Sequence, residues 1–304
     1  MKRNFLALFL GIVLMISVLK LPAPVRHSMS DKQAGAVSSG IAEFPQNIFE
    51  NLNLKANSVY VFDIGENKPI FSLNENLQLP LASLTKIMTA LVAEENIPSY
   101  ALIPVSKNAI AQEGDNGLTI NERWPLFDLI DIMLISSSND AAFALAEEGG
   151  RTSEPGGATS QFSDVGGFVA LMNKKAADLG LAQTYFFNPT GLDISKNQPG
   201  AYGSAKDIAD LFLYIIKEKV SLFEVTRYST LKIDSREFQN TNKIINEIPR
   251  IIFSKTGASD LAGGNLAMVV DRGFENYVII VVMGSTEQGR FEDAKLLYEA
   301  ITGN

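Results

Sequence analysis

The stretch Pro80-Leu81-Ala82-Ser83-Leu84-Thr85-Lys86-Ile87-Met88-Thr89-Ala90-Leu91-Val92 decides how the rest of the chain is arranged. Its apolar residues recur at a helical spacing, at Leu84, Ile87, Met88, Leu91 and Val92. The spacing predicts a helix with one buried stripe, and Ser83 is expected to open it because a short hydroxyl side chain suits an N-cap. Lys86 follows three residues later, so the two side chains are predicted to share a face, roughly 5–6 Å apart at Cβ.

A serine beside a lysine on a fixed helix is an arrangement suited to covalent catalysis. The lysine can act as a base only if burial or a second cation lowers its pKa. Ser-x-x-Lys also occurs at Ser17, inside an apolar run, and at Ser229, where no helical stripe follows. Only Ser83 heads an amphipathic helix, but a short motif of this kind leaves a purely structural serine open as the alternative.

Composition excludes several other kinds of chemistry. The 304 residues are 46% hydrophobic and 20% charged, which is typical of a globular protein with a sizeable core. The net charge of −8 argues against a nucleic-acid partner. Without cysteine there are no disulfides, catalytic thiols or cysteine-ligated metals. The single histidine, His27, argues against a Ser-His-Asp triad and excludes a histidine-rich zinc site, so a serine enzyme would need lysine as its base.

The N-terminus indicates export. Residues 1–20 are predicted to be a signal peptide or an N-terminal membrane anchor, because Lys2 and Arg3 precede the uncharged run Phe5–Leu19. The string Ala34-Gly35-Ala36 lies too far beyond that run for ordinary cleavage, so an uncleaved anchor is favoured. The basic residues would stay in the cytoplasm and place the rest of the chain outside it.

A tether and one folded domain are predicted to follow. Residues 21–43 hold proline, serine, glycine and scattered charges, as tethers do, and residues 44–304 form the domain. Alternation and β-branched runs predict strands at 58–62, 69–73, 250–255, 265–271 and 277–284. Helical patterns cover 125–135, 140–148, 168–179, 204–219 and 291–301.

This order of elements predicts an α+β fold, one antiparallel sheet with helices on both faces. Ser204 and Asp207 are expected to form a capping box at the start of one helix. Residues 149–167, rich in glycine, serine, threonine and proline, are expected to form a mobile surface loop.

Two further motifs carry groups suited to a catalytic site. Ser137-x-Asn139, between two predicted helices, offers a hydroxyl that can pass a proton and an amide that both donates and accepts. Lys255-Thr256-Gly257 follows a buried strand and offers a receptor for a carboxylate, because glycine lets the backbone approach. In isolation, either motif can equally be a polar connection or an exposed strand end.

In this order, the three motifs resemble the active site of penicillin-recognising serine enzymes. Four other segments narrow the resemblance to the D-alanyl-D-alanine carboxypeptidases, the low-molecular-mass penicillin-binding proteins of peptidase family S11. These segments are 80–86, Asn188-Pro189-Thr190-Gly191-Leu192-Asp193, Asn240-Thr241-Asn242 and Arg290-Phe291-Glu292-Asp293-Ala294. The resemblance covers roughly residues 45–303 and implies a β-lactamase/transpeptidase-like fold.

The resemblance also implies roles for individual residues. Ser83 would be the nucleophile that forms an acyl-enzyme, Lys86 would take its proton, and Ser137 would relay a proton to the departing D-alanine. Among the substrate-binding groups, Asn139 would hold the peptide amide. Lys255 and Thr256 would bind the terminal carboxylate, and the backbone N–H groups of Ser83 and Ala258 would form the oxyanion hole.

The function implied is removal of the terminal D-alanine from peptidoglycan stem peptides at the outer face of the bacterial membrane. The expected partners are stem peptides ending in D-Ala-D-Ala, β-lactam inhibitors, and the membrane through the N-terminal segment; no metal or cofactor is expected. A D,D-endopeptidase that cleaves cross-links remains open. A class A β-lactamase is less favoured, because no Glu-x-x-x-Asn string lies between Asn139 and Lys255. A β-lactam sensor without turnover is also less favoured. Such sensors are usually fused through their membrane segment to a signalling domain, and only a few residues precede Phe5.

Overall fold

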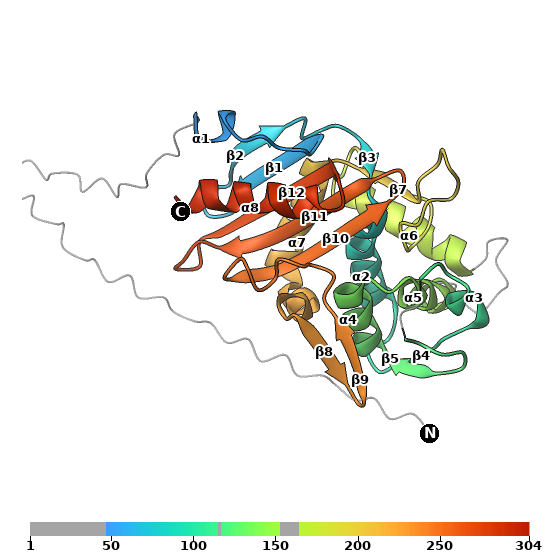
Figure 1. The fold of residues 1–304 in the computed structure, drawn as a ribbon. Coiled ribbons are helices and arrows are strands. Elements are labelled where there is room, and N and C mark those ends of the chain that lie inside the picture. The colour runs from blue at the N-terminus through green and yellow to red at the C-terminus, as the bar shows by residue number, and fades with distance from the viewer. Residues whose placement is uncertain (1–46, 115–116, 153–163, 304) are drawn as a thin grey trace, which may run out of the picture. The chain divides into compact units, whose positions relative to one another are not determined.

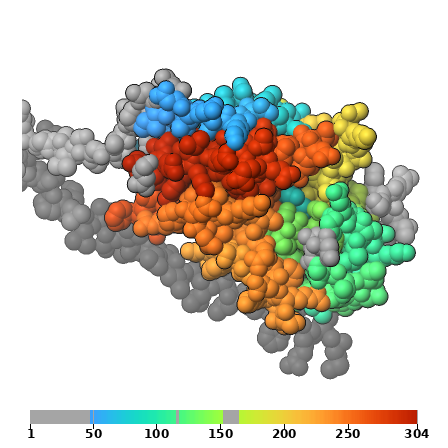
Figure 2. All heavy atoms as spheres, viewed as in Figure 1, coloured from blue at the N-terminus to red at the C-terminus, as the bar shows by residue number. Residues whose placement is uncertain are grey.

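The computed structural model describes residues 47–114, 117–152 and 164–303 (Figure 1). Its main sheet has five antiparallel strands in the order β10-β11-β12-β1-β2. Their bounds are β1 Ser58–Asp63, β2 Lys68–Leu73, β10 Ile251–Ser259, β11 Gly263–Asp271 and β12 Tyr277–Ser285. The first strand therefore pairs with the last, Tyr60 lying opposite Val281. In the space-filling view the first described elements, in blue, pack beside the carboxyl-terminal end of the described chain, in red (Figure 2).

Eight α-helices accompany the strands within the described part of the chain. They are α1 Asn47–Glu50, α2 Thr85–Asn96, α3 Lys107–Ile110, α4 Leu126–Ser136, α5 Asn139–Thr152, α6 Asp164–Asp178, α7 Ala205–Glu218 and α8 Gly289–Thr302. Two 3-10 helices, η1 Ala82–Leu84 and η2 Val220–Arg227, join them. The smaller strands are β3 Leu79–Pro80 with β7 Ala201–Gly203 and β6 Tyr185–Phe186, β4 Leu102–Pro104 with β5 Arg123–Pro125, and β8 Thr230–Ile233 with β9 Arg236–Gln239. No helix of the described residues has both the length and the apolar character needed to span a bilayer.

The sheet divides the core in two, because neighbouring residues of a strand face opposite sides. Val278, Ile280 and Val282 of β12 pack with α1 and α8 on one face. Ile279 and Val281 pack on the other face with the larger helical block that includes α2, α4, α5, α6 and α7. Figure 1 shows α8 crossing the sheet on the side opposite α7. This arrangement confirms the predicted α+β class and the antiparallel sheet covered on both faces.

Helix α2 differs from the prediction because it has no exposed stripe at its start. Every residue from Thr85 to Ala93 is buried, since the helix runs through the middle of the helical block. Ser83 does not cap it either. The helix follows directly on η1, its N-cap position is Leu84, and no side chain caps that position. The Ser83 hydroxyl is thus left available for other contacts.

The prediction of a surface loop at 149–167 does not hold for the described part of this run. Residues 149–152 end α5 and 164–167 begin α6, while 153–163 lie outside the described residues. A methyl group on Gly150 would lie 1.6 Å from the Asp164 carbonyl oxygen, and one on Gly149 would lie 2.6 Å from the Phe168 ring. The glycines therefore bring two helices together, and the expectation of a loop is wrong at both described ends.

The capping box at α7 is half present. The Ser204 hydroxyl accepts a hydrogen bond from the Asp207 backbone N–H at 3.1 Å, as predicted. The Asp207 carboxylate instead accepts from the Gln183 N–H and the Thr184 hydroxyl, both at 2.8 Å. The carboxylate thus fastens α7 to the segment that leads into β6.

Candidate active site

Ser83 and Lys86 meet as the sequence predicts. Lys86 Nζ donates to Ser83 Oγ at 2.8 Å, and also to Asn139 Oδ1 and the Thr190 carbonyl oxygen, both at 2.7 Å. Lys86 is completely buried, while Ser83 is half-buried and so can be reached from solvent. Burial lowers the pKa of Lys86 well below its usual value, and the nearby charge of Lys255 lowers it further. A lysine in this state can accept the proton of the hydroxyl that it contacts.

The second motif lies where α4 gives way to α5. Ser137 ends α4 in the left-handed conformation, with φ 62°, and Asn139 is the first residue of α5. Non-glycine residues rarely adopt this conformation, and strained backbone of this kind clusters at active sites. The turn sends the two side chains to different partners: Asn139 contacts Lys86, and Ser137 Oγ accepts from Lys255 Nζ at 2.9 Å.

Lys255-Thr256-Gly257 lies within β10, which is an edge strand of the sheet. The sequence predicted that this strand ends at Lys255, but it continues to Ser259. Burial, reinforced by the charge of Arg290, lowers the pKa of Lys255 to about 7. Because Lys255 is buried at the strand edge, its ammonium is directed to Ser137 and to the Thr256 carbonyl oxygen.

Gly257 lets β10 approach the turn that carries Ser83. A methyl group at this position would lie 2.9 Å from the Leu81 carbonyl oxygen and 3.2 Å from the backbone nitrogens of Ser83 and Leu84. Ala258 follows at once and is exposed. The strand edge and the 3-10 turn η1 are therefore in direct backbone contact, which only glycine permits.

The segment 188–193 supplies a contact that the sequence did not indicate. The Asn188 amide oxygen accepts from the Thr190 and Gly191 N–H groups at 3.2 and 2.7 Å, which folds the segment back on itself. Gly191, with φ 79°, lies so close to the Ala82 carbonyl that no side chain would fit. The Thr190 carbonyl is thereby aimed at Lys86. A backbone carbonyl has no residue type of its own, so no sequence pattern could point to it.

Two other buried polar residues, Asn265 and Arg290, hold the backbone of the site in place, and neither was predicted to have a role in it. The Asn265 amide donates to the carbonyls of Pro80 and Leu81 at 3.0 and 3.1 Å, just before the nucleophile turn. Arg290 donates to the Gly257 carbonyl. The asparagine could have been suspected from its place in an apolar strand, since a buried polar side chain needs partners.

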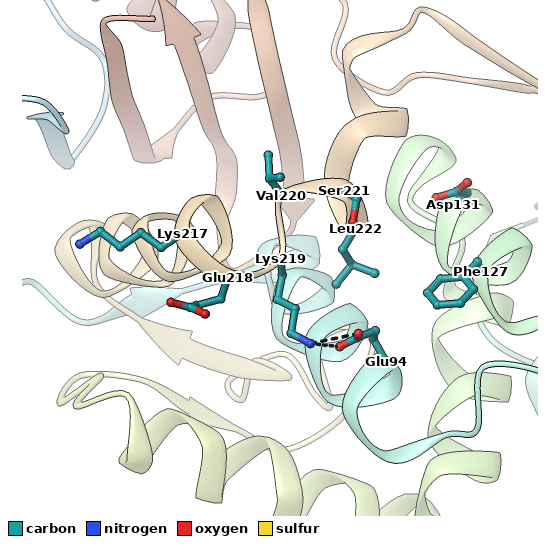
Figure 3. A pocket seen from close by; sticks show the side chains of 9 residues that line it. All are labelled: Glu94, Phe127, Asp131, Lys217, Glu218, Lys219, Val220, Ser221 and Leu222. Carbon is teal, nitrogen blue, oxygen red and sulfur yellow. Dashed lines mark hydrogen bonds and ion pairs between the residues drawn. The ribbon is translucent and has the colours of Figure 1, made fainter. Parts of the chain in front are cut away.

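The described ranges contain no group of three or more histidine, aspartate or glutamate side chains placed to hold a metal ion. A groove of about 550 Å³ lies elsewhere, beside the carboxyl end of α2 (Figure 3). It is lined by Glu94, Phe127, Asp131, Lys217, Glu218, Lys219, Val220, Ser221 and Leu222. Lys219 Nζ donates to both carboxylate oxygens of Glu94 there, at 3.0 and 2.8 Å. The length of α2 separates this groove from Ser83, so the groove is not part of the Ser83 site.

Comparison with known proteins gives a consistent result. The sequence pattern of the D-alanyl-D-alanine carboxypeptidase family matches residues 45–287. The chain is 29% identical over 300 residues to the D-alanyl-D-alanine carboxypeptidase DacF of Bacillus subtilis, covering 95% of this chain and 68% of the relative. It is 28% identical to a D-alanyl-D-alanine endopeptidase of Pseudomonas aeruginosa, covering 80% and 76% of the two chains.

A solved structure agrees with this relationship. Penicillin-binding protein D2 from Listeria monocytogenes, in its ampicillin-bound form, superposes with a TM-score of 0.69 at 26% identity, covering 82% of this chain and 98% of that one. The family pattern thus spans both lysine motifs and the turn between them, and the chain belongs to the D-alanyl-D-alanine carboxypeptidase family, peptidase S11.

Proposed function

We propose that this protein removes the terminal D-alanine from peptidoglycan stem peptides through an acyl-enzyme on Ser83. One observation carries the proposal: the turn Ser137-Ser138-Asn139 connects the two buried lysines, since Asn139 contacts Lys86 and Ser137 contacts Lys255. The nucleophile with its base and the cation with its relay hydroxyl thus form two hydrogen-bonded groups that the backbone of one turn joins. Cleavage of the last peptide bond before a free carboxyl terminus needs both the nucleophile with its base and the cation with its relay hydroxyl.

In the acylation step, Ser83 Oγ attacks the carbonyl carbon of the penultimate D-alanine, and its proton passes to neutral Lys86. The backbone N–H groups of Ser83 and Ala258 stabilise the negative charge on the carbonyl oxygen. Gly257 supports this role because it lets β10, the strand that carries Ala258, approach the backbone nitrogen of Ser83. The C–N bond then breaks, Ser137 passes a proton to the departing amine, and water later hydrolyses the ester.

Substrate binding is assigned to the strand edge and to Asn139. Lys255 and Thr256 receive the terminal carboxylate, since hydrogen bonds between a cation and a carboxylate are about twice as strong as neutral ones. Asn139 holds the substrate amide through the nitrogen that now donates to the Glu113 carbonyl at 2.7 Å. A β-lactam would acylate Ser83 in the same way.

Cleavage of cross-links by the same chemistry is the second candidate, favoured by the Pseudomonas aeruginosa relative named as an endopeptidase. Residues 1–20, which lie outside the described residues, would act as a signal peptide or anchor and place the enzyme at the outer face of the membrane.

Mass spectrometry of muropeptides treated with the full chain tests the activity. Loss of one D-alanine from pentapeptides supports a carboxypeptidase, and loss of cross-linked dimers supports an endopeptidase. No change in either kind of muropeptide overturns the proposal. The Ser83→Ala variant is the control.

A further inference from the structure

Residues 188–192 form a loop whose own hydrogen bonds hold it in one shape. The Asn188 amide oxygen accepts from the N–H groups of Thr190 and Gly191. The nitrogen of the same amide donates to the Leu192 carbonyl at 2.8 Å, and the Leu192 N–H donates to the Thr190 hydroxyl at 3.1 Å. Because these bonds link residues up to four positions apart, the loop is a compact unit rather than an extended chain.

The middle of this loop contacts the turn that carries Ser83. The Thr190 carbonyl accepts from Lys86 at 2.7 Å. A methyl group on Gly191 would lie 1.9 Å from the carbonyl oxygen of Ala82, the residue before Ser83. Ala82 is in the left-handed conformation, with φ 46°, which a non-glycine residue keeps only where its surroundings hold it. The loop therefore supports the Ser83 turn from one side.

Asp193, the next residue, connects the loop to the carboxyl end of β10. Its carboxylate accepts from the Ser259 hydroxyl and from the Leu261 N–H, both at 3.1 Å. Ser259 is the last residue of β10 and directly follows Ala258, and Leu261 lies in the turn to β11. Hydrogen bonds to an ionised carboxylate are about twice as strong as neutral ones, so these two bonds hold the strand end to the loop.

The sheet alone does not fix the place of Ala258. β10 is an edge strand and pairs only with β11, so no strand on its other side sets the distance between its end and the Ser83 turn. Gly257 allows the strand and the turn to approach each other. The loop contacts the turn that carries one proposed oxyanion donor, and Asp193 binds the strand end that carries the other.

We propose that Asp193 is a positioning residue. It holds the end of β10 at the distance from the Ser83 turn at which the N–H groups of Ser83 and Ala258 both reach the substrate carbonyl oxygen. It acts through Ser259 and Leu261 and does not touch the substrate. This inference rests on the proposed function and extends it, because it assigns the carboxylate that sets the geometry of the oxyanion site. A displacement of about 1 Å in such a site can lower a rate by about 10²-fold.

The test measures acylation of the full chain by fluorescent penicillin over a range of concentrations, which separates the first-order acylation rate from the half-saturating concentration. Asp193→Ala removes both bonds and should lower the rate about tenfold, less than complete loss of an oxyanion donor, because the contact at Gly257 remains. The half-saturating concentration should change less than about twofold, since no binding group is removed. Asp193→Asn can still accept from the Leu261 N–H and can donate to the Ser259 oxygen, so its rate should stay within about twofold of wild type.

Asp207→Ala is the matched control. The Asp207 carboxylate also accepts from one backbone N–H and one hydroxyl, those of Gln183 and Thr184, but it fastens α7 rather than β10. This variant should lower the melting temperature about as much as Asp193→Ala and keep the acylation rate within about twofold of wild type. If Asp193→Ala is unfolded at the assay temperature, Ser259→Ala replaces it. That variant removes one of the two bonds, so the expected loss of rate is about threefold.

Three results would overturn the role of Asp193. These are an unchanged rate in Asp193→Ala, or in Ser259→Ala where it takes its place; a loss confined to the half-saturating concentration; or an equal loss of rate in Asp207→Ala or Asp193→Asn. A wild-type chain that takes no label contradicts the proposed function itself. A labelled wild type together with any of the three results contradicts only the inference about Asp193.

Discussion

Replacing Gly257 by alanine tests the contact between β10 and the Ser83 turn. The added methyl group would lie 2.9 Å from the Leu81 carbonyl oxygen and 3.2 Å from the Ser83 nitrogen, where roughly 3.5 Å or more is normal for carbon. The strand and the turn must therefore separate by about half an ångström. The two proposed oxyanion donors, on Ser83 and Ala258, lie on opposite sides of this contact, so the separation pulls them apart.

The magnitude follows from the geometry. Complete loss of one oxyanion donor lowers rates by about 10²–10³-fold, and a partial displacement should lower acylation by about 10- to 100-fold. Overpacking of this kind destabilises a protein by about 1–3 kcal/mol, which lowers the melting temperature by only about 2–12 °C in a chain of this size. At 25 °C the variant should thus remain folded but acylate slowly.

The assay is the second-order rate of labelling by fluorescent penicillin, with the melting temperature measured in parallel. Gly167→Ala in α6 is the matched control, because its new methyl group would meet nothing closer than 3.9 Å. That control should label at the wild-type rate and gain up to about 1 kcal/mol of stability from better helix propensity. A Gly257→Ala variant that labels as fast as wild type would refute the reasoning, as would a control equally impaired.

Three further predictions concern charged groups. Lys86→Ala should lower the penicillin acylation rate by about 10²–10⁴-fold while His27→Ala leaves it unchanged; the opposite pattern would exclude a lysine base. Because burial and Arg290 lower the pKa of Lys255 to about 7, its ammonium is lost above that pH, so the preference for acid over amide substrate in kcat/KM should be strongest below pH 7 and decline above it. Burial, with the charge of Asp128, raises the pKa of Asp131 from 3.8 to about 7, which makes its ionisation unfavourable in the folded state. Asp131→Asn should therefore leave the melting temperature unchanged near pH 4 and raise it at pH 8. The free energy of unfolding at pH 8 should increase by about 2 kcal/mol after allowance for partial exposure. No gain in stability at pH 8 would contradict this.

The sequence predicted the sheet and its flanking helices well, because burial on one or both faces leaves a regular pattern. The alternation at 58–62, the returning run at 69–73 and the three β-branched runs near the carboxyl end became the five strands of the main sheet. Strands of two or three residues, such as Leu79–Pro80 and Tyr185–Phe186, are too short to show any period. The glycines at 149 and 150 were misread because glycine marks both loops and close helix contacts.

The candidate site was predictable where one side chain acts on another. Ser83, Lys86 and Asn139 come together in one hydrogen-bonded group, and Ser137 and Lys255 come together in a second. Lys255 also donates to the backbone carbonyl of Thr256. Contacts made by backbone groups were not predictable, because any residue has the same carbonyl that Thr190 presents to Lys86. Nor could spacing show that Asp193 meets Ser259, since they belong to different elements and the pairing arises only when the chain folds.

The most direct measurement of the central proposal is the site of covalent labelling by penicillin. The full chain is incubated with penicillin, digested, and mapped by mass spectrometry, with Ser83→Ala and Ser137→Ala in parallel. We expect one adduct per chain, on Ser83, which disappears in Ser83→Ala and still forms in Ser137→Ala. A wild-type adduct on Ser137, or an adduct that persists in Ser83→Ala, would contradict it.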